Sequence, residues 1–242
     1  MSLVVTVYVR EGIVMAADSR LTLNTEMKQP DKTVVNLAVG QSDSNYKLFL
    51  APNGIGIATY GAADIAGVPI AGYVESFIAK ELQDDPVGVE DAGKKLLAHF
   101  SAFTPIPKTQ YHVAGYQKTT NQPEHQVWHV DLDSKQISRL NPPGQQGASW
   151  GGEADILGRL IQPVVQINQQ EKIEHKFPHF SIPWQFFTLQ DAIDFAVFAV
   201  RSTIDAIRFQ PRAKTVGGPI DVLVLKPTGA TWIQRKELCV TN

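Results

Sequence analysis

The residue after the initiator methionine is a serine, and its place in the chain could make it a nucleophile. Once Met1 is removed, Ser2 carries both a hydroxyl and the α-amino group of the chain. Such an amine ordinarily has a pKa of about 7.7–8.0, so it can accept the hydroxyl proton directly or through one water. Nucleophile and base would then belong to one residue, and no histidine would be needed. A small second residue such as serine is what methionine-trimming enzymes usually accept.

An acidic residue is expected beside this serine. The apolar run Leu3–Val9 predicts a strand, residues 10–12 a turn, and the run 13–17 a second strand antiparallel to the first. Asp18 ends the second strand and therefore lies next to the start of the first. This geometry puts its carboxylate near Ser2.

A lysine completes the candidate group. Lys47 begins a second predicted hairpin. Its strands, 47–51 and 55–60, flank an Asn-Gly pair that suits a type I′ turn. An ammonium beside a hydroxyl lowers the pKa of both hydroxyl and amine, and a carboxylate such as Asp18 holds that ammonium charged and oriented. The alternative is that the lysine is a solvated strand end and the aspartate a turn cap.

Backbone donors for an oxyanion are expected at residues 59–64, Thr-Tyr-Gly-Ala-Ala-Asp. This segment leaves a strand and enters a helix, and small residues let a substrate approach its N–H groups closely. The alternative is a plain strand-to-helix turn that needs glycine for its backbone.

The remaining elements follow from hydrophobic periodicity and turn residues. Helices are predicted around 70–82 and 89–100 and from a capping-box-like start at Thr188. Another is predicted from near Glu153 as far as Ile167, with Pro163 expected to kink it or end it early. Further strands are predicted at 111–116, 126–132, 136–140, 220–225 and 230–234. Residues 21–46 are expected to form a long loop with one short strand at 33–39, and residues 168–184 an aperiodic excursion.

This order of elements favours an α+β fold. Antiparallel hairpins with helices inserted in pairs predict two sheets that face each other, with helices covering their outer sides. The first two strands are apolar on both faces and belong in the middle. No linker divides residues 1–242, so a single domain is expected.

Composition limits the partners and the compartment. With 22 basic and 24 acidic residues the net charge is −2, so there is no basic field to bind nucleic acid. No run approaches the roughly 18 apolar residues of a membrane span, and the first strand is too short for a secretory signal. The single cysteine, Cys239, excludes an internal disulfide. We expect a cytoplasmic protein with no membrane partner and no cofactor. His125 and His129 are four apart, but on a predicted strand, so no metal site is expected.

Three blocks of the sequence resemble the proteasome β-subunit family of N-terminal nucleophile (Ntn) hydrolases. They are GIVMAADSR at 12–20, Lys-Leu-Phe-Leu at 47–50 and Tyr-Gly-Ala-Ala-Asp at 60–64. In that family the nucleophile, usually threonine, lies sixteen residues before the aspartate, and counting back from Asp18 gives Ser2. The resemblance implies a four-layer αββα fold, hydrolysis of a peptide or small amide through an acyl-enzyme, assembly into a homo-oligomeric ring and an ATPase as a candidate partner.

The resemblance also implies roles for individual residues. Ser2 would be the nucleophile with its own amine as base, and Asp18 and Lys47 the supporting pair. The backbone N–H of Gly61 or Tyr60 would bind the oxyanion. Further supporting candidates are Ser19, Arg20 and Glu153.

Two blocks depart from the family pattern. The family has a serine in a GSGS-like block and an Asp-x-x-Ser before a late Gly-Gly, whereas this chain reads Ser-Trp-Gly-Gly-Glu at 149–153 and Ala-Lys-Thr-Val at 213–216. Glu153 could replace the first serine, but nothing evident replaces the second pair. A catalytically inactive member with a structural or assembly role, and an amidase for a small substrate, therefore stay as alternatives.

Overall fold

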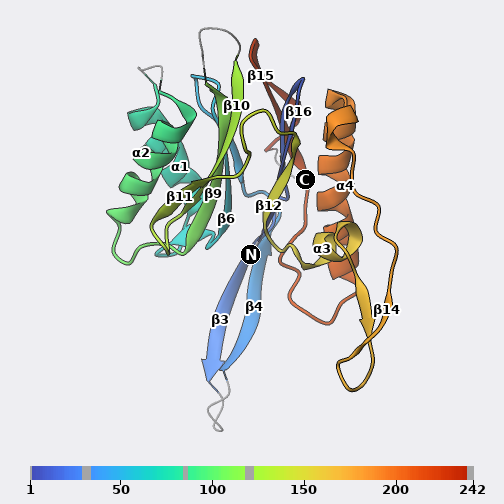
Figure 1. The fold of residues 1–242 in the computed structure, drawn as a ribbon. Helices are drawn as coiled ribbons and strands as arrows, with labels where there is room; N and C mark the ends of the chain where they lie inside the picture. The colour runs from blue at the N-terminus through green and yellow to red at the C-terminus, as the bar shows by residue number, and fades with distance from the viewer. Residues whose placement is uncertain (1, 29–33, 84–86, 118–122, 239–242) are drawn as a thin grey trace.

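Two five-stranded antiparallel sheets form the centre of the computed structural model, which describes residues 2–28, 34–83, 87–117 and 123–238 (Figure 1). The first sheet has the order β12 (Gly147–Gly152), β1 (Leu3–Val9), β2 (Gly12–Ala17), β15 (Asp221–Lys226) and β16 (Gly229–Gln234). The second has the order β11 (Gln136–Arg139), β10 (Glu124–Asp131), β9 (Thr109–Gln117), β6 (Gly56–Gly61) and β5 (Leu48–Leu50). The prediction of an antiparallel α+β fold is confirmed.

Helices cover the outer side of each sheet. α1 (Ile70–Glu81) and α2 (Val89–Ser101) share an apolar core with the second sheet. α3 (Asp155–Ile161) and α4 (Leu189–Arg208) share another core with the first sheet. A third apolar core lies between the two sheets. The order in space is therefore helices, sheet, sheet, helices, as Figure 1 shows.

β1 and β2 lie in the middle of this arrangement because both of their faces are apolar. Every residue of the two strands is buried. Val5 and Val7 belong to the core under α4, whereas Val4 and Tyr8 belong to the core between the sheets. The prediction that both faces of these strands are covered is confirmed, and it puts the start of β1 deep inside the molecule.

The predicted helices are confirmed with small shifts of their ends. Pro69 precedes the first residue of α1, where a missing N–H costs nothing. Thr188 caps α4 in a full capping box with Asp191. α3 is shorter than expected because it ends two residues before Pro163. None of the helices in the described part of the chain combines the length and apolar character needed to cross a bilayer.

The expected long loop at 21–46 is wrong. β3 (Leu21–Lys28) and β4 (Val34–Ser42) form an antiparallel hairpin that projects beyond both sheets (Figure 1). The strand expected at 33–39 falls within β4, except for its first residue, which lies outside the described residues. The hairpin belongs to neither large sheet, and a loop was expected because the stretch is rich in polar residues, such as the Gln-Ser-Asp-Ser-Asn run at 41–45.

The expected type I′ turn is also wrong. Of the Asn53-Gly54 pair only Gly54 has a positive φ, 82°, and a type I′ turn needs two such residues. The N–H of Gly54 donates to the carbonyl of Ala51 at 2.9 Å, so the turn is centred on Pro52 and Asn53. Proline fixes φ at the second position of a type I turn, and the following glycine takes the left-handed conformation.

Three further short pairs and strands escaped prediction. β12 was read only as a divergent block, because three of its six residues are glycines. β14 (Ile173–Lys176) lies in the expected excursion and pairs with β13 (Val165–Ile167), which precedes it, and the 3₁₀ turn η1 (Trp184–Phe186) follows. β7 (Asp64–Ile65) and β8 (Val68–Pro69) form a two-residue ladder before α1.

Candidate active site

Asp18 and Lys47 form a buried ion pair at the end of β2. Lys47 Nζ lies 2.8 Å from Asp18 Oδ1, and the two side chains are 2% and 0% exposed. The same carboxylate oxygen accepts the N–H of Leu3 at 3.0 Å, and the other accepts the N–H groups of Arg20 and Gly217, each at 3.0 Å. Three backbone donors and one ammonium therefore hold this carboxylate in one orientation.

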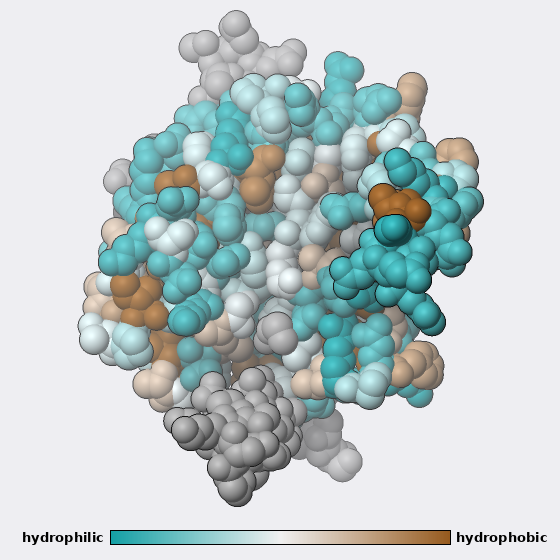
Figure 2. All heavy atoms as spheres, turned by 60° about the horizontal axis from the view of Figure 1, so that its bottom comes forward, coloured by the Kyte–Doolittle hydropathy of each residue, from teal (hydrophilic) through white to brown (hydrophobic). Residues whose placement is uncertain are grey.

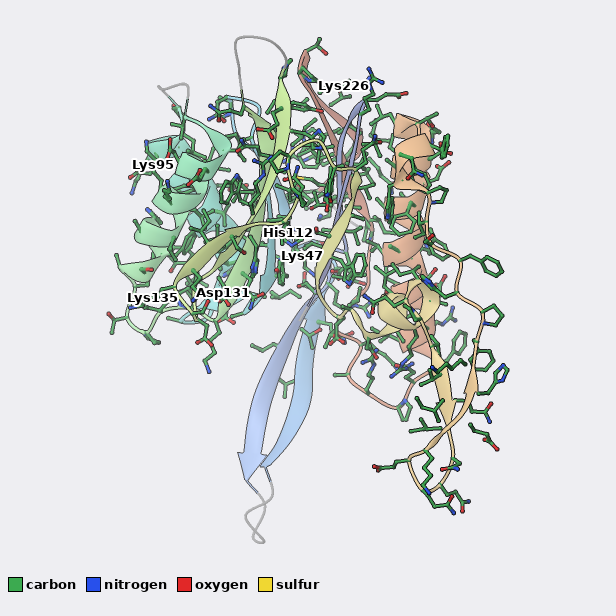
Figure 3. All side chains as sticks on the ribbon, in the orientation of Figure 1. Lys47, Lys95, His112, Asp131, Lys135 and Lys226 are labelled. Atoms are coloured by element: carbon green, nitrogen blue, oxygen red, sulfur yellow. The ribbon has the colours of Figure 1, made fainter. Side chains whose placement is uncertain are left out.

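Lys47 lies between the two sheets, where Figure 3 labels it. Burial lowers the pKa of its ammonium, while the charge of Asp18 opposes that shift. A lysine in this position is tied to its partner and is also easier to deprotonate than a lysine in water. The alternatives of a solvated lysine and a simple turn cap do not fit this geometry.

Ser2 lies against the same pair through the peptide bond that it shares with Leu3. It is 2% exposed, and its carbonyl oxygen accepts the N–H of Glu153 at 2.8 Å. Gly152 has a φ of 95°, and a Cβ on it would lie 1.7 Å from the Ser2 carbonyl oxygen. The backbone at the end of β12 thus packs directly against the Ser2 carbonyl, and only glycine at position 152 allows this close contact. Met1 lies outside the described residues.

Glu153 connects Ser2 to the segment that precedes Gly217 and Gly218. Its carboxylate is largely buried and accepts the hydroxyl of Thr215 at 2.9 Å and an N–H of Arg212 at 3.3 Å. Thr215 is itself buried and lies two residues before Gly217, which donates to Asp18. Sequence reasoning missed Thr215 and Arg212, because Thr215 falls at an unspecified position of the Asp-x-x-Ser pattern at 213–216 and Arg212 lies just before that block.

Ser19 and Arg20 continue the chain away from the ion pair. The Ser19 hydroxyl is buried and donates to the carbonyl of Pro219 at 2.6 Å, so it ties two segments together. The Arg20 guanidinium makes two hydrogen bonds of 2.7 Å to the Asp43 carboxylate. This contact lowers the pKa of Asp43. Arg20 therefore points to a partly exposed rim and contacts Asp18 only through its backbone.

Gly61 and Tyr60 lie at the end of β6 and present their N–H groups to opposite sides. The N–H of Thr59 donates to the Lys47 carbonyl at 2.9 Å, and the N–H of Ala62 donates to Lys108 in the other direction. Because N–H groups alternate along a strand, that of Gly61 points to the Lys47 side and that of Tyr60 to β9. Of the two expected donors, this geometry favours Gly61.

A hollow of about 270 Å³ adjoins this group of residues. Arg20 and Gly217 form one of its walls, and apolar side chains of α4 form another. The apolar side chains of α4 are Ile204 and Ile207, and the rest of the lining is Arg208, Lys214, Val216 and Gly218. A larger hollow, about 500 Å³, lies away from these residues between α3 and the segment 177–182.

His125 and His129 both lie on β10. His129 stacks near Tyr60, and His125 contacts the carbonyl of Gln145. Among the described residues, no three or more His, Cys, Asp or Glu side chains come close enough to hold a metal ion.

Comparisons with known proteins find a similarity of fold to solved structures. No family model and no curated protein matches the chain. A solved structure of the Gly-1 mutant of Anbu from Hyphomicrobium sp. strain MC1 superposes with a TM-score of 0.58. The match covers 100% of this chain and 89% of that one, at 13% sequence identity. At this identity the match shows that the chain is similar in fold to that Anbu structure.

Proposed function

We propose that this protein is a proteasome-like Ntn hydrolase with the four-layer αββα sandwich of that class, and that it cleaves amide bonds with Ser2 as nucleophile. The observation that carries the proposal is the buried Asp18–Lys47 ion pair, which adjoins the peptide bond between Ser2 and Leu3. A lysine and an aspartate are costly to bury, and such pairs are often retained for function rather than for stability.

The proposed reaction begins after Met1 is removed. The α-amine of Ser2 takes the hydroxyl proton, directly or through a water, while the Lys47 ammonium stabilises the developing alkoxide. The hydroxyl oxygen attacks the substrate carbonyl, and the Gly61 N–H stabilises the oxyanion. The C–N bond then breaks, the α-ammonium returns its proton to the leaving amine, and an ester on Ser2 remains. Water hydrolyses this ester by the reverse sequence of proton transfers.

Glu153 would support this reaction by fixing the terminal residue. Its backbone N–H holds the Ser2 carbonyl, and its carboxylate connects that contact to Thr215. The family groups missing at 213–216 would in this way be replaced in part by a different set of residues. A peptide substrate and a small amide both remain compatible with this proposal.

A second candidate function is an inactive subunit with a role in assembly. It is favoured by Ala213 and Val216, which stand where the resemblance expects an aspartate and a serine. It is also favoured by the arm (residues 162–183), which carries many exposed apolar side chains. Under either proposal we expect a homo-oligomer, for which exposed apolar surface is a usual interface.

Labelling with an electrophile that needs both a hydroxyl and a free α-amine tests the proposal. Wild-type protein should be labelled at one site, Ser2→Ala should not react, and Ser2→Thr should react because it keeps the hydroxyl. Hydrolysis of fluorogenic peptides and small amides, measured in parallel, should follow the same order among the three proteins. Labelling that persists in Ser2→Ala would refute the site, and absence of labelling in processed wild type would favour the inactive subunit.

A further inference from the structure

A second buried lysine–aspartate pair lies in the first sheet, and the proposed reaction does not use it. Lys236 Nζ bonds to Asp221 Oδ2, and the backbone N–H of Lys236 donates to Asp221 Oδ1 at 2.8 Å. The side chains of Lys236 and Asp221 are only 5% and 1% exposed. Asp221 begins β15, while Lys236 follows the end of β16, so the pair fixes the chain after its last strand.

This second pair lies next to the Asp18–Lys47 pair. Asp221 is opposite Ala17 in the β15–β2 ladder, and Ala17 directly precedes Asp18. Directly opposite residues in an antiparallel ladder present their side chains on the same face of the sheet, and Ala17 faces the core between the sheets. Asp221 therefore also faces the second sheet, to which β5 and the start of the Lys47 hairpin belong.

Lys236 lies close to the other member of the first pair, Lys47. Its Nζ lies 4.5 Å from the centroid of the Tyr46 ring, and Tyr46 directly precedes Lys47. Each member of the second pair thus lies beside the residue that precedes a member of the first pair: Asp221 beside Ala17, and Lys236 beside Tyr46. All four charged side chains are 5% exposed or less, so bulk water and salt screen the interaction between the two pairs only weakly.

We infer that Lys236, fixed by Asp221, is a positioning residue that sets the electrostatic field at Lys47. This inference rests on the proposed function. The charged groups that act on Lys47 are Asp18 and Asp43, which favour its ammonium, and Lys236, which disfavours it. Lys236 adds to the effect of burial, so both lower the pKa of Lys47 while the two carboxylates raise it. A lysine tuned in this way gives up its proton more readily, and activity should fall at high pH as it does so.

The test compares three variants of the second pair with the wild-type protein. Lys236→Met removes the ammonium. Asp221→Asn combined with Lys236→Met removes both charges, so that no lone carboxylate is left buried. Lys236→Arg keeps the positive charge and should behave as wild type. The matched control is Arg235→Met, because Arg235 is the neighbouring cation, is exposed, and contacts Tyr46 and Trp232 by its guanidinium face.

Two measurements are made on each protein. The ¹³Cε resonance of Lys47, assigned by its loss in Lys47→Arg, gives the lysine pKa without any activity. Labelling of Ser2 as a function of pH gives the alkaline limb of the reaction. We expect both to move to higher pH by on the order of half a pH unit in Lys236→Met, to move in the same direction but less in the double variant because the Asp221 carboxylate is also removed, and to stay in place in Lys236→Arg and Arg235→Met.

The outcomes separate the inference from the proposed function. If Lys47 titrates at the same pH in wild type, Lys236→Met and the folded double variant, the inference is overturned. If the titration moves but wild-type Ser2 is never labelled, the coupling of the two pairs stands and the proposed hydrolase function fails. A purely structural role for Lys236 would lower the unfolding midpoint of the variants and leave the titration unchanged.

Discussion

The carboxylate of Asp18 receives four donors, from Leu3, Arg20, Gly217 and Lys47. Asp18→Asn keeps the shape of the side chain but leaves the Lys47 ammonium buried without a counter-charge. We expect a loss of about 3–5 kcal/mol in the free energy of unfolding, measured by urea titration, together with loss of Ser2 labelling.

The matched control for this variant is Asp43→Asn. Asp43 also pairs with a cation, Arg20, but its side chain is 42% exposed. Its removal should cost less than about 1 kcal/mol because water screens the pair. Equal costs for the two substitutions would contradict the view that Asp18 is the essential partner of a buried charge.

His112 gives the molecule a predicted sensitivity to acid. It is buried between the sheets, where Figure 3 labels it, and its Nδ1 lies 3.0 Å from the Thr6 hydroxyl. Burial, with a smaller effect of His129, lowers the pKa of His112 to about 3 from 6.5. The unfolded chain therefore binds a proton below pH 6.5 that the folded chain refuses.

Stability should fall as the pH drops from about 6.5 towards 3, by up to about 1.4 kcal/mol per pH unit from this histidine. Urea midpoints measured across that range in wild type and His112→Asn give the comparison. The variant should lose the part of the slope that His112 contributes, because it cannot titrate. Identical slopes for the two proteins would show that His112 does not control the acid response.

Single residues were predicted well where their chemistry depends on a strand end and poorly where it depends on distant segments. Asp18 follows a strand that turns back on the first, so its approach to Ser2 is a local consequence of a hairpin. Thr215, Arg212 and Lys236 reach the site from segments far along the chain, and no spacing or composition marks them. Their approach to the site is visible only in three dimensions.

At the scale of elements, the end of β12 determines where the chain terminus lies. Gly152→Ala would put a methyl group within 1.7 Å of the Ser2 carbonyl oxygen, at a φ of 95°. We expect a loss of about 1–3 kcal/mol in unfolding free energy and a large fall in Ser2 labelling, because the backbone of Ser2 must move away from β12.

Gly144→Ala separates the two effects of that substitution. Gly144 also has a positive φ, 73°, but a Cβ there meets nothing within 4 Å. Its replacement should cost about 1 kcal/mol from backbone strain and should leave labelling unchanged. If both variants label equally, β12 does not position the nucleophile.

Elements that belong to one of the apolar cores were predictable from their sequence pattern, whereas β12 and the β3–β4 hairpin were not. β1, β2 and the helices carry an apolar pattern because each packs against a core. β3 and β4 form a separate two-stranded sheet, and β12 is rich in glycine because the Tyr60 ring lies directly over Gly151. Tertiary packing, rather than strand propensity, therefore places β12 beside β1.

At the scale of the whole molecule, the arm gathers a large share of the exposed apolar side chains of the described residues. It carries Val164, Val165, Ile167, Ile173, Phe177 and Phe180, which are 36–87% exposed. Figure 2 views the end of the molecule from which the β3–β4 hairpin projects and shows separate hydrophobic patches on a mainly hydrophilic surface. Binding of a second copy of the chain would bury such apolar patches, and this burial favours association.

We expect the wild-type protein to sediment as an oligomer. Phe177→Ser with Phe180→Ser should shift the distribution towards the monomer in analytical ultracentrifugation. Phe209→Ser is the control, because Phe209 is 82% exposed but lies at the end of α4, outside the arm. A monomeric wild type, or equal effects of the two changes, would contradict a role for the arm in assembly.

Peptide mapping by mass spectrometry of the labelled wild-type protein tests the central claim most directly. The account predicts an N-terminal peptide that begins at Ser2 and carries the adduct on that residue, joined to both hydroxyl and amine. An N-terminal peptide that still holds Met1 and no adduct, with substrate hydrolysis nevertheless observed, would contradict the account, because the chemistry would then belong to another residue.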